Sequence, residues 1–317
     1  MTPSNFPASE PSNPSEPRRP VLTDGGLETW LIFERGVDLP EFAAFPLLET
    51  SAGRGLLAEY WELNLGVATA GGLDFILGAP TWRASADWGA RLGYDAAALD
   101  RINREGIAFM QGLRDRHQSP SSAMPVWGSV GPRGDAYNPQ RPTSAAEAEA
   151  YHRPQIDSFK TAGADAFTAQ TMTHSDEAIG IALAAKAAGL PCIVSFTTET
   201  DGRLPGGETL GEAIQRVDDA TDASPDSYMI NCAHPDHFRD ALTADAPWLQ
   251  RLGGIRANAS RLSHAELDNA TELDPGDAVE LGALYRQLRD TVPGLTVLGG
   301  CCGTDHRHIE QICKACA

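Results

Sequence analysis

Short apolar runs recur along the chain, and most are followed by a segment with the spacing of an amphipathic helix. Several runs, such as CIVSF at 192–196, are apolar without alternation, which is typical of strands buried on both faces of a parallel sheet. The pattern predicts eight strands, at 21–23, 75–80, 125–130, 166–171, 191–197, 227–232, 252–258 and 295–300.

The segments between these runs carry helix signals. Thr209 and Glu212 have the spacing of a capping box ahead of an apolar stripe. An alanine-rich helix is predicted over 175–188, with Gly189 as its stop signal. Pro154 lies inside an earlier helical segment, so that helix is predicted to start late or to kink.

Eight units of strand followed by helix in about 300 residues predict an α/β fold, a single-domain (β/α)8 TIM barrel. We expect the barrel to occupy 20–317 and the Pro-, Ser- and Asn-rich stretch 1–19 to be a disordered tail. An open doubly wound sheet is the alternative. It usually carries a G-x-G-x-x-G turn after an early strand, which Gly25 and Gly26 do not complete.

Cysteines stand where a barrel carries its chemistry, at the carboxyl-terminal ends of strands. Cys232 ends the sixth strand, and Cys301 and Cys302 follow the eighth. Only one other strand lies between the sixth strand and the eighth. Several thiolates together favour zinc over magnesium or calcium, and three protein ligands leave a fourth position open, as in catalytic zinc sites. The alternative is that these cysteines are buried and inert.

The adjacent pair Cys301 and Cys302 needs a special backbone, because neighbouring residues of a strand point to opposite faces. Both can bind one ion only if the chain leaves strand geometry there. We expect Gly299, Gly300 and Gly303 to give that conformational freedom.

The remaining cysteines fit a structural role. Cys313 and Cys316 share a helical face with two isoleucines, which indicates core packing, although a second metal or redox pair is the alternative. Cys192 opens an apolar strand and is predicted to lie in the core. Four histidines near the candidate ligands are interpreted as solvated or capping side chains: His234, His237, His306 and His308.

Charge and composition limit the classes of partner that we expect for this protein. The net charge is −18, and an acidic surface repels nucleic-acid phosphates and anionic lipid, so we expect neither partner. No apolar stretch is long enough for a membrane span, and the first residues do not resemble a secretory signal. We therefore expect a cytoplasmic protein that acts on small molecules; the sequence does not define its oligomeric state.

Five segments resemble one known family: DGGLETWL at 24–31, GSVGPRGDAY at 128–137, VSFTTETDGRLPGGETLGEAI at 194–214, MINCAHPDHF at 229–238 and LGGCCGTDHRHI at 298–309. The chain resembles the homocysteine S-methyltransferases, including betaine- and S-methylmethionine-dependent members, and the homocysteine-binding module of cobalamin-dependent methionine synthase. The resemblance runs from about Leu22 to Ile312. It implies a (β/α)8 barrel with Zn2+ held by Cys232, Cys301 and Cys302.

The resemblance also implies substrate-binding residues. Asp24 and the backbone of Gly25 and Gly26 would hold the amino-acid end of homocysteine, unless Asp24 merely caps the next helix. Trp82 would wall the donor pocket through cation–π contact, unless it only packs. Several relatives bind the homocysteine amino group with a glutamate at the end of the fourth strand, and Gln170 takes that place here. An amide accepts a hydrogen bond but gives up the ion pair.

The expected function is zinc-dependent transfer of a methyl group from an onium donor to the homocysteine thiol, giving methionine. The donors favoured are S-methylmethionine and S-adenosylmethionine. Zinc would generate the reactive thiolate, so no dedicated general base or other catalytic residue is expected. One alternative is a zinc methyltransferase or demethylase for another thiol or onium substrate such as betaine, which Gln170 favours. Another is a non-catalytic zinc-binding barrel.

Overall fold

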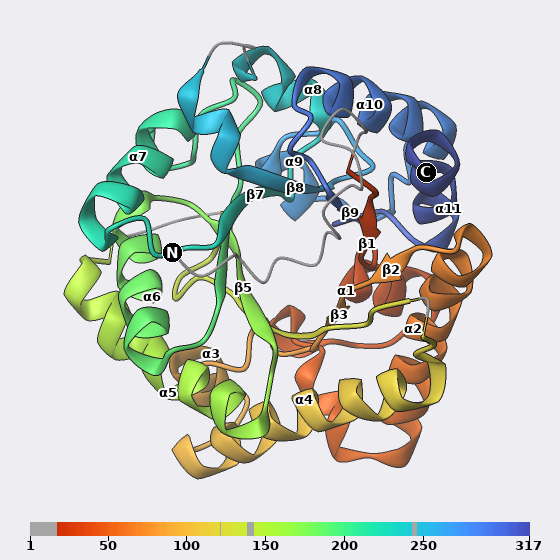
Figure 1. Cartoon of the computed structure of the whole chain (residues 1–317). Helices are drawn as coiled ribbons and strands as arrows, with labels where there is room; N and C mark the ends of the chain where they lie inside the picture. Colours follow the sequence, from red (N-terminus) through yellow and green to blue (C-terminus); the bar gives the residue numbers. More distant parts are fainter. Residues whose placement is uncertain (1–17, 121, 138–142, 243–245) are drawn as a thin grey trace.

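Parallel strands form a central, nearly closed barrel with helices around it (Figure 1). The computed structural model describes residues 18–120, 122–137, 143–242 and 246–317. Most of the predicted tail, 1–17, lies outside the described residues. The described strands are β1 (Val21–Leu22), β2 (Asp74–Phe75), β3 (Leu77–Gly78), β4 (Val126–Val130), β5 (Ala166–Met172), β6 (Cys192–Phe196), β7 (Ser227–Asn231), β8 (Leu252–Ala257) and β9 (Val297–Gly300).

The barrel closes through the second predicted strand. The hydrogen-bonded order is β2-β1-β9-β8-β7-β6-β5-β4-β3, and all pairs are parallel. Only Ile76 separates β2 from β3, so one continuous segment pairs with β1 at its start and with β4 at its end. The eight predicted strands and the TIM-barrel class are therefore confirmed.

The helices surround the barrel in chain order (Figure 1). The α-helices are α1 (Leu27–Thr29), α2 (Ser51–Gly71), α3 (Ala86–Arg91), α4 (Ala96–His117), α5 (Ala145–Ala162), α6 (Ser175–Ala188), α7 (Leu210–Thr221), α8 (Pro235–Phe238), α9 (His264–Asp268), α10 (Ala278–Thr291) and α11 (His306–Cys316). Shorter 3-10 or π turns are η1 (Trp30–Glu34), η2 (Pro40–Phe42), η3 (Phe45–Glu49), η4 (Arg239–Ala241) and η5 (Pro247–Arg251).

The helices described below begin or end at the capping residues and glycines that the sequence indicated. Helix α7 begins after Thr209 with the predicted capping box, and α6 ends at Ala188 before left-handed Gly189. The late start predicted for α5 was wrong, because this helix begins at Ala145 and runs through Pro154 to Ala162. Pro154 and Ala150, four residues earlier, are both exposed, so the carbonyl that loses its partner faces water.

The lower part of the barrel is filled by side chains. One cluster of buried residues, separate from the core between strands and helices, consists of Val21, Ile76, Trp127, Ala166, Ile193, Met229 and Val297. Most of these residues lie in the first half of their strands. The interior is thus a packed core, which leaves the carboxyl-terminal mouth for a site.

The structural cysteines behave as predicted. Cys313 and Cys316 are buried on the inner face of α11, together with Ile309 and Ile312. Cys192 is buried at the start of β6. None of the three belongs to the group of cysteines at the barrel mouth.

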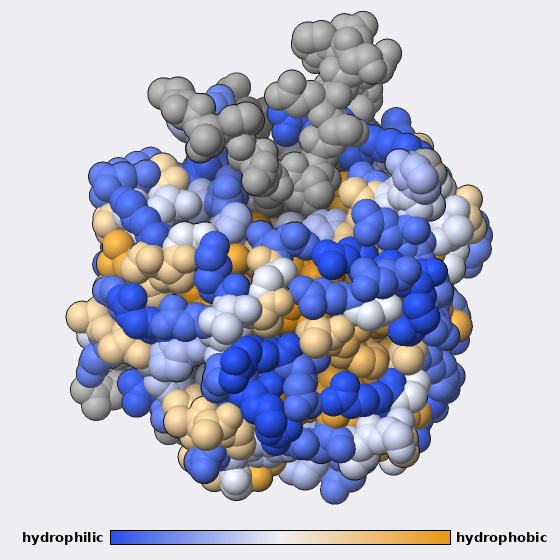
Figure 2. Space-filling model, turned by 60° about the horizontal axis from the view of Figure 1, so that its bottom comes forward, coloured by the Kyte–Doolittle hydropathy of each residue, from blue (hydrophilic) through white to orange (hydrophobic). Residues whose placement is uncertain are grey.

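The surface is mainly hydrophilic, with small apolar groups between the polar residues of the face in Figure 2. Over the described residues, the large hydrophobic side chains that are exposed are Phe33, Leu262 and Val279. No helix in the described part of the chain has the length and apolar character needed to cross a membrane.

Candidate functional site

Three cysteine sulfurs meet at the carboxyl-terminal mouth of the barrel. Cys232 follows β7, whereas Cys301 and Cys302 follow β9. Their Sγ atoms all lie within 4.8 Å of one another, and those of Cys232 and Cys302 are 3.6 Å apart. Among the described residues, this is the one group of three or more cysteine, histidine or acidic side chains placed to hold a metal ion.

Cys232 reaches the group through an unusual backbone conformation. Its φ of 59° is left-handed, which is uncommon for a residue with a side chain. The Cys232 carbonyl accepts hydrogen bonds from Thr197 Oγ1 at 3.2 Å and His264 Nε2 at 2.8 Å. These buried partners hold the turn that directs the sulfur into the mouth.

The glycines around Cys301 and Cys302 act differently from the prediction. Only Gly303 has a left-handed φ, of 80°; Gly299 and Gly300 remain in β9. A Cβ on Gly299 would lie 2.3 Å from Thr23 Cγ2 and 2.9 Å from the Asp24 carbonyl oxygen. The first two glycines are therefore required by close packing rather than by backbone freedom.

Replacing Gly299 with alanine is expected to push β9 away from β1 and to cost about 1–3 kcal/mol of stability. Gly66→Ala is the matched control, because that exposed glycine of α2 has nothing within 4 Å of its missing Cβ. The control is expected to be neutral or stabilising by up to about 1 kcal/mol. Urea unfolding compares the two; equal stabilities would contradict the close-packing role.

The cysteine group favours a bound cation. Hydrogen bonding from Cys232 and Cys302, followed by the positive charge of Arg256, lowers the pKa of the Cys301 thiol well below its ordinary value. Hydrogen bonding to Cys301 and burial raise the pKa of Cys232 well above its own. Three adjacent thiols do not ionise together unless a cation balances their charge. The donor set, sulfur from three cysteines, fits a soft or borderline divalent metal.

Tyr137 lies against the sulfurs and was not singled out from the sequence, although it ends the GSVGPRGDAY segment. Its hydroxyl is 2.9 Å from Cys232 Sγ and 3.5 Å from Cys302 Sγ. Its ring stacks on His264 at 4.3 Å between centroids. Tyr137 thus provides a polar contact to two of the three sulfurs.

Asp24 is present at the mouth, but its carboxylate is already paired. Arg256 Nη2 lies 3.0 Å from Asp24 Oδ1, and Tyr60 donates to Asp24 Oδ2 at 3.2 Å. The same guanidinium donates to the carbonyl oxygens of Gly25 and Gly300. Asp24 does not cap the next helix, since α1 begins after Gly26 without a side-chain cap.

Arg256 could have been noticed as the one charged residue within an otherwise apolar strand, β8. It was missed because its partner Asp24 is 232 positions away in the chain. The pairing neutralises Asp24, so this carboxylate alone does not provide a free negative charge for a ligand.

A small cavity of about 70 Å³ brings the predicted substrate residues to the cysteines. It is lined by the three cysteines and by Asp24, Gly25, Gly26, Trp82 and Gln170, together with Glu28 and Arg256. Glu28, on α1, was also missed by sequence reasoning. Burial, with the nearby charges of Cys301 and Asp24, raises the pKa of its carboxyl to about 7.

A large cavity of about 380 Å³ adjoins the small one and shares Trp82, Cys232 and Cys302 with it. Its wall includes the aromatic residues Phe33, Phe42, Trp88 and Tyr137 and the acidic residues Glu41, Asp135, Asp268, Glu272 and Asp274. The Arg83 guanidinium lies 4.4 Å from the ring centroid of Trp82 and 3.4 Å from that of Trp88. One face of Trp82 is therefore covered by a cation of the protein itself.

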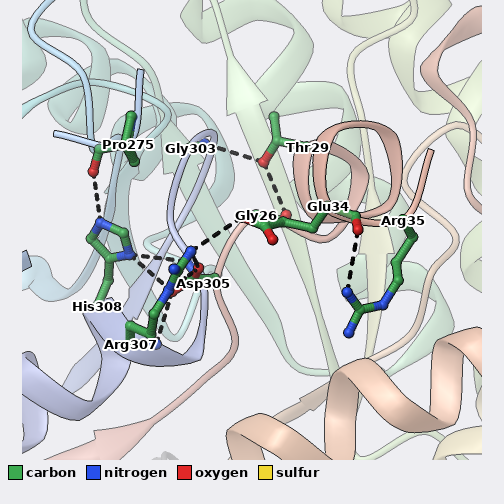
Figure 3. A network of polar contacts seen from close by, with 9 residues as sticks. All are labelled: Gly26, Thr29, Glu34, Arg35, Pro275, Gly303, Asp305, Arg307 and His308. Carbon is green, nitrogen blue, oxygen red and sulfur yellow. Dashed lines mark hydrogen bonds and ion pairs between the residues drawn. The ribbon is translucent and has the colours of Figure 1, made fainter. Parts of the chain in front are cut away.

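Contacts behind the site fix the loop after β9 to α1 (Figure 3). The amide of Gly303 donates to Thr29 Oγ1 at 3.1 Å, and Thr29 donates to the Gly26 carbonyl at 3.0 Å. His308 bonds to Asp305 Oδ1 at 3.1 Å and to the Pro275 carbonyl oxygen at 2.8 Å. His308 thus supports the loop and is not part of the cysteine group, and neither are His234, His237 and His306.

A parallel barrel whose mouth joins three thiols to two cavities defines an enzyme of the (β/α)8 class with a site suited to a metal ion. The family model described as homocysteine S-methyltransferase matches residues 21–316. The chain belongs to this family of methyltransferases.

Individual relatives are distant. The methionine synthase of Mycobacterium tuberculosis is 27% identical over 241 residues, covering 71% of this chain. The chain spans about a fifth of that relative's length, 19%. The oxidized form of the homocysteine methyltransferase MmuM from Escherichia coli aligns with a TM-score of 0.74 at 21% identity, covering 92% of this chain and 94% of the other. Its metallated form aligns with a TM-score of 0.73 at 20% identity, covering 95% and 97%. These structures share the fold of this chain.

Proposed function

We propose that this protein transfers a methyl group from a cationic onium donor to the thiol sulfur of homocysteine and so forms methionine. The observation that carries the proposal is the position of the three cysteine sulfurs. Cys232 and Cys302 lie where the small cavity meets the large one, which is lined by aromatic and acidic residues. Two substrates can thus meet beside the sulfurs, which also favours a catalytic over a purely structural role for the cysteines.

We assign Zn2+ to Cys232, Cys301 and Cys302. All three side chains offer sulfur, and three protein ligands match the number found in catalytic zinc sites. When bound, zinc would supply the positive charge that keeps a thiol ionised at neutral pH. Tyr137 and the hydrogen bonds to the Cys232 carbonyl keep the protein sulfurs oriented.

The small cavity suits the acceptor. Its polar lining consists of Asp24 paired with Arg256, the peptide groups of Gly25 and Gly26, Glu28 and the amide of Gln170. The Gly26 amide already donates to the Thr304 carbonyl, which limits what this peptide group offers a ligand. The cavity volume of about 70 Å³ restricts the acceptor to a small molecule.

The large cavity suits the donor. Aromatic faces attract onium groups, and carboxylates attract their positive charge. Because arginines of the protein lie against the rings of both Trp82 and Trp88, the better candidates for cation–π contact are Phe33, Phe42 and Tyr137. We favour S-methylmethionine or S-adenosylmethionine as donor, with betaine less favoured.

The protein's part in the reaction is alignment. A displacement at carbon requires the acceptor sulfur, the methyl carbon and the departing atom to be in line, and fixed orientation lowers the barrier. The thiolate gains the methyl group and the donor leaves as the neutral sulfide or amine. No proton moves in the transfer step, so no general base is needed there.

The proposal is tested by an activity matrix with the zinc-loaded protein. We expect methionine from homocysteine with S-methylmethionine or S-adenosylmethionine, and a slower reaction or none with betaine. Another small thiol is the second candidate acceptor, because Gln170 stands where relatives carry a glutamate. Methylation of such a thiol, without any methionine from homocysteine, would reject the first assignment and support the second.

A further inference from the structure

Glu28 is a half-buried acid that the fold does not use. Its side chain lines the small cavity beside Asp24, Gln170 and Cys301. Within the described residues, its carboxylate has no hydrogen-bond or ion-pair partner beyond its own backbone. Stabilisation of the folded protein therefore does not explain this carboxylate.

The charges around Glu28 leave it uncompensated. The charged side chains lining the small cavity, besides the cysteines, are Asp24, Glu28 and Arg256. Arg256 lies 3.0 Å from Asp24 and donates to two backbone carbonyls as well. Gln170 is neutral and provides no charge. A desolvated carboxylate in this setting is stabilised when a ligand brings a cation.

We propose that the Glu28 carboxylate binds the ammonium group of the acceptor amino acid in this protein. Glu28 follows β1 on α1, whereas Gln170, the position at which the resemblance implies a glutamate, lies in β5. The inference rests on the proposed function and names the residue that recognises the acceptor's amino end. Gln170 remains beside it as an uncharged acceptor.

The position of Glu28 also fits the length of the ligand. The same small cavity holds Cys301 and Cys302, so a short amino acid can place its sulfur at the cysteines and its ammonium group at Glu28. The rival role for Glu28 is removal of the proton from the acceptor thiol. The two roles differ in which substrate group they affect.

The experiment compares Glu28→Gln with the wild-type protein, both zinc-loaded, using homocysteine and 4-mercaptobutanoate, its analogue without the amino group. We expect the variant to raise KM for homocysteine by about 10- to 100-fold, the loss of one charge-assisted hydrogen bond. KM for the analogue and kcat for both thiols should change less than about threefold. Glu59→Gln is the control, because Glu59 pairs with Arg35 at the surface.

Gln170→Glu in the Glu28→Gln background is expected to restore part of the preference for homocysteine. An equal loss of kcat with both thiols would instead assign Glu28 to proton removal and overturn the inference. An unchanged KM for homocysteine would overturn it as well.

Calorimetric binding of the two thiols separates this inference from the proposed function. If the wild-type protein binds homocysteine more tightly than the analogue but forms no methionine, the proposed function fails and Glu28 keeps its role. If binding is equal, or absent for both thiols, the inference about Glu28 fails.

A pH profile of the wild-type protein tests the inference even if the variants do not fold. Burial raises the pKa of Glu28 to about 7, so its charged form is lost as the pH falls through that value. The preference for homocysteine over the analogue should therefore rise between about pH 6 and pH 7.5. Asp24, Cys301 and Arg256 are the other charged or titratable groups that act on Glu28. A flat ratio would overturn the inference.

Discussion

Cys232→Ser is expected to remove the metal ion and to lower the rate of methyl transfer by more than about 100-fold. This loss exceeds the roughly 10- to 100-fold effect of replacing a residue that only supports a metal ligand. Serine oxygen is a poor replacement for thiolate, and two cysteines then remain of the three. Without the metal, a free thiol with a pKa near 8.5 is ionised only to a few per cent at neutral pH. Metal analysis and a methionine assay measure both effects.

Cys313→Ser is the matched control for this prediction. Cys313 is buried in α11 and takes no part in the cysteine group. It is expected to keep the metal and to lose only packing stability. Full metal content and activity in Cys232→Ser would refute the shared metal site.

Arg256→Met is expected to destabilise the fold by about 3–5 kcal/mol, because it leaves the buried carboxylate of Asp24 without its partner. It also removes the donors to the carbonyl oxygens of Gly25 and Gly300. Unfolding in urea measures the loss. Arg286→Met is the control: Arg286 pairs with Asp290 at the surface, with a side chain 59% exposed, and is worth at most about 1 kcal/mol.

The double variant Asp24→Asn with Arg256→Met is expected to recover part of this stability, since no uncompensated charge then remains. If the single and double variants unfold at the same urea concentration, the ion pair does not contribute as described.

The barrel was predictable because its strands and helices are marked by short patterns in the sequence. Strands buried on both faces have continuous apolar runs, and caps such as Thr209 mark where helices begin. The predictions that failed concern features that depend on the tertiary environment of a residue. Pro154 was expected to disturb α5, but an exposed position lets the helix continue. The division of the second strand at Ile76 reflects closure of the barrel, which no local pattern records.

The cysteine group was predictable for a different reason. Thiols at the ends of two nearby strands must approach one another over the mouth of a barrel. The partners of the site were not predictable, because they depend on contacts between distant segments. Arg256 meets Asp24, and Tyr137 meets Cys232, only after the barrel has closed. The sequence identified the glycines before Cys301, but glycine is required there because β9 approaches β1 closely, and not because the backbone must be flexible.

X-ray absorption at the zinc edge tests the central claim most directly. The claim is that Cys232, Cys301 and Cys302 bind zinc and that the acceptor sulfur takes the remaining position. We predict three sulfur ligands at about 2.3 Å in the zinc-loaded protein, and four after addition of homocysteine. Fewer than three sulfurs without substrate, or no additional sulfur with homocysteine, would contradict the account.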